Sequence, residues 1–456
     1  MSNEQKTWLA FGCVGLLLLI IGFGQSWSVA LGIFNLCLIS AVMALGVNMQ
    51  WGYAGLLNVG IMGFAALGGM AAVLVSQSPV VAAWEAGWAK LLLAGLFFAA
   101  TVALAIFAYK KMDAGRHRTI AISTTLIIGL FITRYFLDPA VASIEAVEPA
   151  KTGFLGGMGL PILFSWVIGG IVAAGIAWLI GKVALGLRAD YLAIATLGIS
   201  EIIIAVMKNE DWLTRGVKNV TGLPRPVPYE IELQNSDWFQ NLINWWHSGS
   251  LSLLADADRQ NALKQFTIEG SSIFVKLCYA GLFASVLVII LMLSVRALNS
   301  PWGRMMRAIR DNEIAAGAMG KDVTRKHLQI FIIGSAVVGV AGAMLTTLDG
   351  QFTPTSYQPL RFTFLIWVMV IVGGSGNNMG SVLGGFLIWL VWIEAEPVGV
   401  WLIEFGTGWM DDSNALKNHL IDNAQHMRLF FMGLVLLLVL RFSPGGILPE
   451  VIKKRS

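Results

Sequence analysis

The sequence predicts an all-α protein that crosses a membrane about ten to twelve times, and two observations carry this prediction. Hydrophobic residues make up 56% of the 456 residues, charged residues make up only 13%, and the mean hydropathy is +0.72. A soluble domain carries about 25% charged residues, and a chain of this size could not bury so much apolar surface in water. The apolar residues also form blocks long enough for helices across a hydrocarbon layer of about 30 Å. They lack the period of two typical of a membrane barrel, so helices are expected.

Twelve candidate membrane segments follow from these apolar blocks. Several are short or interrupted by glycine, so we expect some to be broken or re-entrant. The segments are 8–24, 29–50, 54–76, 89–109, 119–137, 160–181, 189–207, 272–295, 327–348, 362–376, 378–396 and 428–441. We interpret the first as a retained helix, because no small-x-small cleavage site follows Gly24.

The charges of the loops predict that both termini are cytoplasmic, because Lys and Arg accumulate on that side of a membrane. One set of alternate loops and the tail carry the basic residues Lys110, Lys111, Arg116, Arg118, Lys182, Arg188, Arg296, Arg304, Arg307, Arg310, Lys321, Arg325, Lys326, Lys453, Lys454 and Arg455. The other set is mixed or acidic, with Asp138, Glu145, Glu148, Glu394, Glu396, Asp411, Asp412 and Asp422. The long loop 208–271 is therefore expected on the outer side, where its tryptophans fit the headgroup level.

Motifs of soluble enzymes are absent from the sequence. It contains no G-x-x-x-x-G-K-[ST] phosphate loop, no H-E-x-x-H and no G-x-S-x-G. Cys13, Cys37 and Cys278 lie in apolar blocks without the spacing of a metal site or a disulfide framework. We therefore predict no catalytic residues, no metal and no cofactor bound by this chain.

The basic loop 299–326 is expected to form two short helices. Ser300 and Pro301 are favourable at an N-cap and a first helical position, Asp311 is placed to cap the second helix, and Gly320 is placed to end it in the left-handed conformation. Three arginines of the first helix are spaced three residues apart and therefore share one face: Arg304, Arg307 and Arg310. The pair fits docking of a cytoplasmic partner and, equally, contact with anionic lipid.

Two glycine-rich regions, 52–69 and 373–385, indicate broken or closely packed helices. Asn58, Asn377 and Asn378 add amide groups there. These regions could line a pathway of small residues or could serve tight helix packing, and the sequence leaves both interpretations open.

Three charged residues fall in or near apolar blocks, where a charge is costly unless it is paired or faces water. They are Arg134, Glu201 and Lys276. Arg134 and Lys276 fit helix ends whose side chains reach the interface. Glu201 is the better functional candidate, because apolar residues follow it directly.

Several of these stretches together resemble the permease subunits of branched-chain amino acid ABC importers, of the LivM-like type. The stretches that carry the resemblance are 58–64, 188–198 with Glu201 after it, 303–320, 373–384 and 442–447. They are distributed from about residue 40 to residue 450. The loops 208–271 and 397–427 are longer than is usual for such permeases.

The resemblance implies that residues 1–456 form one permease domain of a bacterial inner membrane, with 208–271 as an outer loop and 296–326 as a cytoplasmic coupling loop. It implies coupling to an ATPase through Arg304, Arg307, Arg310, Asp311, Glu313, Ala316 and Gly320. It implies a translocation pathway that includes Asn58, Gly60, Gly63, Thr196, Gly198, Glu201, Gly373, Gly374 and Gly376.

The partners that the resemblance implies are a second homologous permease, two cytoplasmic ATPase subunits that bind ATP and Mg²⁺, a periplasmic solute-binding protein and membrane lipid, with no nucleic acid. The expected solutes are branched-chain or other hydrophobic amino acids. Urea, short amides and other small carboxylates are alternatives within the same importer class.

Two other classes of function make different demands on the sequence. An ion-coupled secondary transporter would need paired carboxylates or cation-binding residues at the midplane, and only Glu201 fits. A membrane enzyme would need clustered His, Asp or Cys on facing helices, and the sequence has no such pattern.

Overall fold

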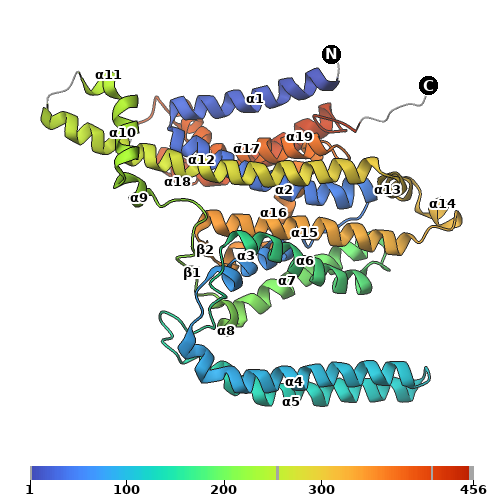
Figure 1. Cartoon of the computed structure of the whole chain (residues 1–456). Helices are drawn as coiled ribbons and strands as arrows, with labels where there is room; N and C mark the ends of the chain where they lie inside the picture. Colours follow the sequence, from blue (N-terminus) through green and yellow to red (C-terminus); the bar gives the residue numbers. More distant parts are fainter. Residues whose placement is uncertain (1–2, 253–255, 412–413, 451–456) are drawn as a thin grey trace.

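A computed structural model describes residues 3–252, 256–411 and 414–450 of the chain. Lys453, Lys454, Arg455 and Asp412, which entered the prediction of orientation, lie outside these residues. The described chain is a bundle of helices that lie roughly along one axis, with a two-stranded sheet near one end (Figure 1).

Ten described helices have the length and composition needed to cross a membrane. They are α1 (Asn3–Gly24), α2 (Trp27–Ala54), α4 (Val81–Lys111), α5 (Arg116–Glu145), α6 (Leu163–Ala184), α7 (Ala189–Asn209), α12 (Asp256–Asn299), α15 (Val323–Asp349), α17 (Asn378–Gly406) and α19 (Met427–Phe442), which reaches this length together with the preceding turn from Ala424. Two shorter apolar helices are α3 (Ile61–Ser76) and α16 (Pro359–Gly373). Each of the twelve predicted segments overlaps one of these helices, so the all-α polytopic fold class is confirmed. At about 1.5 Å per residue, α3 and α16 are too short to span the membrane alone.

The remaining elements are short and lie mainly at the two ends of the bundle. They are α8 (Asp211–Thr214), α9 (Glu230–Gln234), α10 (Asp237–Trp246), α11 (Ser248–Leu251), α13 (Pro301–Asp311), α14 (Glu313–Ala318), α18 (Ala415–Asp422), the 3₁₀ turns η1 (Pro354–Ser356) and η2 (Ala424–His426), and the strands β1 (Val220–Thr221) and β2 (Gln351–Phe352). The strands pair antiparallel, with Val220 opposite Phe352.

The structure corrects three predicted boundaries. The segment expected over 54–76 does not begin as a helix, because Gly55 ends α2 at φ +70° and residues 55–60 are irregular. The segment expected over 272–295 begins at Asp256, well inside the predicted outer loop. The segment expected to end at residue 396 continues through Pro397 to Gly406.

The centre of the bundle is α2, which is buried without interruption from Cys37 to Gln50. It packs against α12, α15, α16 and α17, and α15 in turn packs against α3 and α6. Small residues let these backbones approach closely, which is the usual basis of helix packing in membranes. A carbon atom added at Gly46 would lie 3.0 Å from Val338 Cγ2 of α15.

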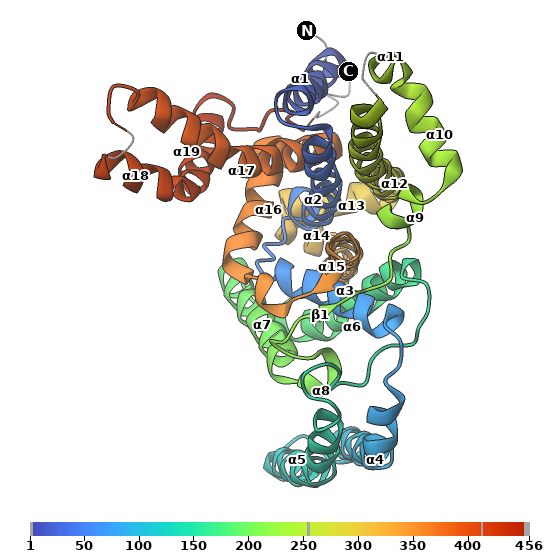
Figure 2. The ribbon, with the colours of Figure 1, turned by 90° about the vertical axis from the view of Figure 1, so that its left-hand side faces the viewer.

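The α4–α5 hairpin stands apart from this bundle, as Figures 1 and 2 show. Its two helices pack mainly against each other. Only Ala83, Gly87 and Ala94 of α4 are buried. The opposite edge of the bundle carries α1, and α1 begins at the same end of the bundle as α13 and α14 (Figure 1).

Candidate functional site

The α13–α14 pair protrudes at one end of the bundle (Figure 1). Pro301 occupies the first turn of α13 as predicted, although the Ser300 hydroxyl donates to the Ala297 carbonyl instead of capping the helix. The prediction that Asp311 caps α14 is wrong. Asn312 takes this place, and its Oδ1 accepts a hydrogen bond from the Ala315 amide at 2.9 Å.

The surface of α14 is open at most positions. Glu313 is exposed, as is Gly320, which has the predicted left-handed conformation at φ +75°. Ala316 is buried. An exposed Ile314 and an exposed Met319 give the pair apolar side chains that no described residue covers, which suits contact with another surface.

The three arginines of α13 do not share one environment. Arg304 is exposed, whereas Arg307 is half-buried and its Nη2 donates to the Leu298 carbonyl at 2.9 Å. Arg310 binds the bundle: its Nη1 donates to the Gly52 carbonyl at the end of α2 and to Glu450 Oε2 at 2.9 Å. Two of the three side chains therefore point back toward the bundle, whereas Arg304 is open.

The charge of Arg310 is well compensated. Burial lowers its pKa, but hydrogen bonds and attraction from Glu450 and from Asp311, whose Oδ1 lies 3.1 Å from Nε, raise the pKa above its ordinary value overall. A half-buried guanidinium with two carboxylate partners stays charged, and it links α13, α2 and the C-terminal segment 443–450.

A buried network of amides lies where helices are broken, directly behind this link. Asn48 Nδ2 donates to Asn378 Oδ1 at 3.1 Å, and Asn48 Oδ1 accepts from the Gly376 amide at 2.8 Å. Asn58 Nδ2 donates to Gln50 Oε1 at 2.9 Å, and Gln50 Nε2 reaches Ser335 Oγ at 3.1 Å. The amides thereby satisfy backbone and side-chain groups that the breaks would leave unpaired in lipid.

Asn48 and Gln50 of this network were not predicted from the sequence. The signal that could have found them is two amide side chains inside an otherwise apolar helix, because such groups are costly unless they are paired. Asn58 was predicted, and its Oδ1 also accepts from the Gly60 amide at 2.9 Å.

The predicted pathway glycines lie in close helix contacts. A carbon atom added at Gly63 would lie 2.9 Å from Ser200 Cα of α7, and one at Gly60 would overlap the Thr196 carbonyl oxygen. Thr196 is buried, and its Oγ1 accepts from the Val59 amide at 3.0 Å. These contacts hold the 55–60 segment and α3 against α7.

The second glycine group makes a similar contact between α16, α17 and the C-terminal segment. Added carbons at Gly373 and Gly374 would overlap carbonyl oxygens of Gly380 and Leu448. Gly376 has φ +79°, and it lines a hollow of about 230 Å³ beside Arg307 at the α13 end of the bundle.

Glu201 and Gly198 lie elsewhere. Both are exposed on α7, and nothing lies within 4 Å of a carbon added at Gly198. Glu201 lines an open groove of about 1020 Å³ between α7, α16, α17 and α19, which also contains the cationic side chains of Lys208, Arg361 and Arg428. The structure therefore separates Glu201 from the buried amide network.

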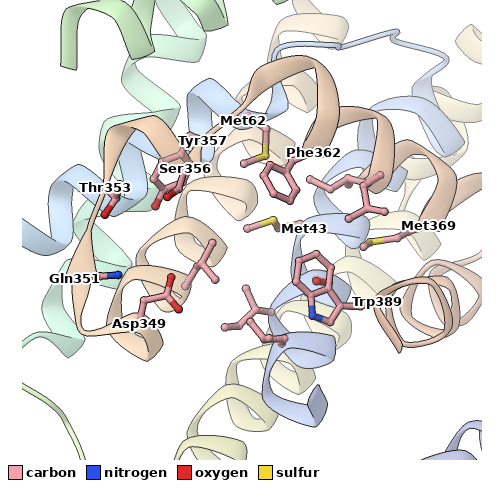
Figure 3. Close-up of a pocket in the computed structure, with 16 residues that line it drawn as sticks. Met43, Met62, Asp349, Gln351, Thr353, Ser356, Tyr357, Phe362, Met369 and Trp389 are labelled. Carbon is pink, nitrogen blue, oxygen red and sulfur yellow. The ribbon is translucent and has the colours of Figure 1, made fainter. Parts of the chain in front are cut away.

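A smaller and more apolar hollow of about 270 Å³ adjoins this groove. It lies between α2, α3, α15, α16 and α17, and Asp349 lies at one end (Figure 3). Tyr357 and Leu365 line both spaces and so form the wall between them. Its lining was not predicted from the sequence, because it combines residues from helices that are far apart along the chain.

A sequence model of the family described as "Branched-chain amino acid transport system / permease component" matches residues 120–440. The chain belongs to this family. As a member of this family with ten helices in its described part that are long and apolar enough to cross a membrane, it is a multi-pass protein of the bacterial inner membrane.

Several curated relatives of this permease are named as branched-chain amino acid transport permeases, and others are named as fructose or xylose permeases. Over 228 residues, it is 28% identical to the high-affinity branched-chain amino acid transport system permease protein LivM of Salmonella typhimurium and to that of Escherichia coli, with 48% of each chain covered. It is 29% identical over 155 residues to the probable branched-chain amino acid transport permease protein LivM of Methanocaldococcus jannaschii, covering 34% of this chain and 41% of that one. The permease thus spans about half the length of the curated relatives it matches. No solved structure matches it.

Proposed function

We propose that the chain is the membrane-spanning permease subunit of an ATP-binding-cassette importer for branched-chain and other hydrophobic amino acids. The observation that carries the proposal is the α13–α14 pair, which is open on its outer surface and tied to the bundle on its inner surface. The family and the printed names of the relatives support the solute class.

The proposed partners are a second homologous permease, two cytoplasmic ATPase subunits and a periplasmic solute-binding protein. ATP and Mg²⁺ belong to the ATPases, and this chain performs no chemistry. The side of the membrane that carries α13 and α14 is taken as cytoplasmic from the basic loops, and the described ends of the chain lie at that same end (Figure 1).

Arg310 supplies a mechanical link for coupling. Movement of α13 under a closing ATPase pulls on the Gly52 carbonyl and on Glu450, while the amide network ties the end of α2 to the start of α17 through Asn378. Movement of the α13–α14 pair is thereby transmitted to the broken-helix segments through hydrogen bonds instead of through apolar contacts. ATP hydrolysis, and not the solute, provides the difference in free energy between the two states.

The first test is purification of the tagged chain in mild detergent, followed by identification of the proteins that remain bound. Recovery of a second permease and ATPase chains supports the importer. Recovery of the chain alone, together with uptake driven by an ion gradient in vesicles, contradicts it and points to the ion-coupled alternative at Glu201.

A charge reversal in the α13–α14 pair tests the proposed coupling role directly. Glu313→Arg changes an exposed side chain, so we expect normal amounts of folded protein in the membrane but at least about tenfold slower leucine uptake, because like or misplaced charges at an interface cost several kcal/mol. The matched control is Asp113→Arg, which reverses an exposed charge in the α4–α5 turn. Equal uptake by the two variants would show that α14 is not part of the interface with the ATPase.

A further inference from the structure

The hollow of about 270 Å³ beside the outer loop is a built pocket and not a gap in packing. Five helices and the segment 350–357 contribute to its lining, which consists of Leu36, Ile39, Ser40, Met43, Met62, Leu345, Asp349, Gln351, Thr353, Ser356, Tyr357, Phe362, Leu365, Ile366, Met369 and Trp389. It is slightly smaller than the roughly 300 to 1,000 Å³ of pockets that hold drug-sized ligands. Its size therefore suits a molecule of a few heavy atoms, such as an amino acid.

The lining is divided into a polar end and an apolar end. Figure 3 shows Asp349, Gln351 and Thr353 on one side of the space, whereas Met43 and Met369 lie toward the other. Methionine side chains adapt to apolar groups of different shape. The pocket therefore fits an amphiphilic molecule with a polar head and a short hydrocarbon tail.

The negative charge of Asp349 favours a cationic group at the polar end of the pocket. Asp349 is the last residue of α15, where the partial negative charge of the helix terminus adds to its own. Within the described parts of the chain, its carboxylate has neither an ion pair nor a hydrogen-bond donor. Asp349 is exposed and lines the pocket, so its carboxylate is accessible to a cationic group that binds there.

Two further polar atoms of the lining also lack partners. Thr353 Oγ1 and Trp389 Nε1 are buried and form no hydrogen bond within the described residues. The indole N–H can only donate, and the hydroxyl can donate or accept. The pocket therefore has donors for an acceptor group in addition to the acceptor at Asp349.

From these features we infer that the pocket binds a hydrophobic α-amino acid, with its ammonium group on Asp349 and its side chain among the methionines. The inference rests on the proposed function for the identity of the solute and extends it by assigning a site inside a single subunit. Tyr357 closes the pocket toward the groove that contains Glu201, and its hydroxyl lies 3.0 Å from Thr346 Oγ1, which holds the ring in place.

The test is equilibrium binding to the purified full-length chain in lipid nanodiscs, with three probes of equal tail. They are L-leucine, 3-methylbutylamine, which keeps the ammonium alone, and 4-methylpentanoate, which keeps the carboxylate alone. We expect leucine and the amine to bind, and the carboxylate to bind at least about tenfold more weakly. Equal or tighter binding of the carboxylate would overturn the inference, as would failure of leucine to bind.

Two variants and a control locate the binding. Asp349→Asn is expected to weaken leucine and amine binding at least about tenfold, whereas Asp237→Asn, an exposed acid of α10, leaves both unchanged. Ser40→Leu fills the pocket without altering its charge and is expected to abolish binding of both probes. Unchanged binding to Asp349→Asn or to Ser40→Leu would overturn the assignment.

Leucine uptake by the assembled importer separates this inference from the proposed function. Uptake by the wild-type importer without binding to this pocket would retain the importer and overturn the pocket. Binding that depends on Asp349 in a chain that supports no ATP-driven uptake would retain the pocket and contradict the importer.

Discussion

The α4–α5 hairpin and the helices around α2 are both strongly apolar, yet they face opposite surroundings. In α4, almost every position is open, and its Leu and Phe side chains point outward. In α2, twenty of the 28 residues are buried by neighbouring helices. Figure 2 shows the hairpin apart from the bundle in which α2 lies centrally.

The comparison shows that polar and small residues, more than hydrophobicity, distinguish the two regions. α2 buries Asn35, Ser40, Asn48 and Gln50, all of which contact other helices or line the pocket. Lipid offers such groups no hydrogen bonds, so they are stable only in a protein-facing position. The hairpin presents large apolar side chains, which lipid solvates as well as protein does.

The largest expected effect comes from crowding the central packing. Gly68→Val places a side chain against the Gly339 carbonyl of α15, whereas Gly95→Val in α4 adds one where nothing lies within 4 Å. We expect Gly68→Val to destabilise the protein by about 3 kcal/mol or more and to remove most folded protein from detergent extracts. Size-exclusion profiles of the two variants measure the difference in folded yield. Similar folded yields would show that the central bundle is packed no more tightly than the α4–α5 hairpin.

A smaller effect is expected from removing a buried amide. Asn48→Leu deletes two hydrogen bonds, to Asn378 and to the Gly376 amide. At about 0.6 to 1.7 kcal/mol per hydrogen bond between membrane helices, the loss is roughly 1 to 3 kcal/mol.

Thr101→Val is the control for this variant in the hairpin, because the Thr101 hydroxyl only donates to the Phe97 carbonyl of its own helix. Its effect should be within about 0.5 kcal/mol. Thermal unfolding midpoints in detergent compare the two, and equal midpoints would show that the amide network does not stabilise the break.

The smallest effect on stability, but a large effect on function, is expected at Arg310. Arg310→Gln removes the ion pair with Glu450, which is half-buried and contributes about 1 kcal/mol, and it disconnects α13 from α2. We expect leucine uptake to fall at least about tenfold while ATP hydrolysis by the assembled importer continues.

Arg116→Gln, at the exposed start of α5, is the matched control for Arg310→Gln. It should leave both uptake and hydrolysis unchanged, since the hairpin does not contact α13. Parallel loss of uptake in both variants would indicate a general effect of positive charge at this end of the bundle instead of a specific link.

Much of the bundle could be predicted because each spanning helix is a local consequence of a long apolar block. The irregular stretch before Ile61 and the early start of α12 at Asp256 were missed, since the apolar block does not mark where a backbone breaks or where a helix extends beyond the membrane. The interpretation of Lys276 also changed: its Nζ donates to the Ser28 carbonyl of α2 at 2.9 Å, which makes it a contact between helices.

The sequence by itself determined the membrane class, the number of apolar segments and the family, because these depend on composition and on motifs that are contiguous along the chain. Only the tertiary structure decided which helices face protein, that Arg310 binds Gly52 and Glu450, and that Asp349 shares a pocket with Trp389. Such contacts join residues tens to hundreds of positions apart, and their geometry depends on how the helices pack and not on any local pattern.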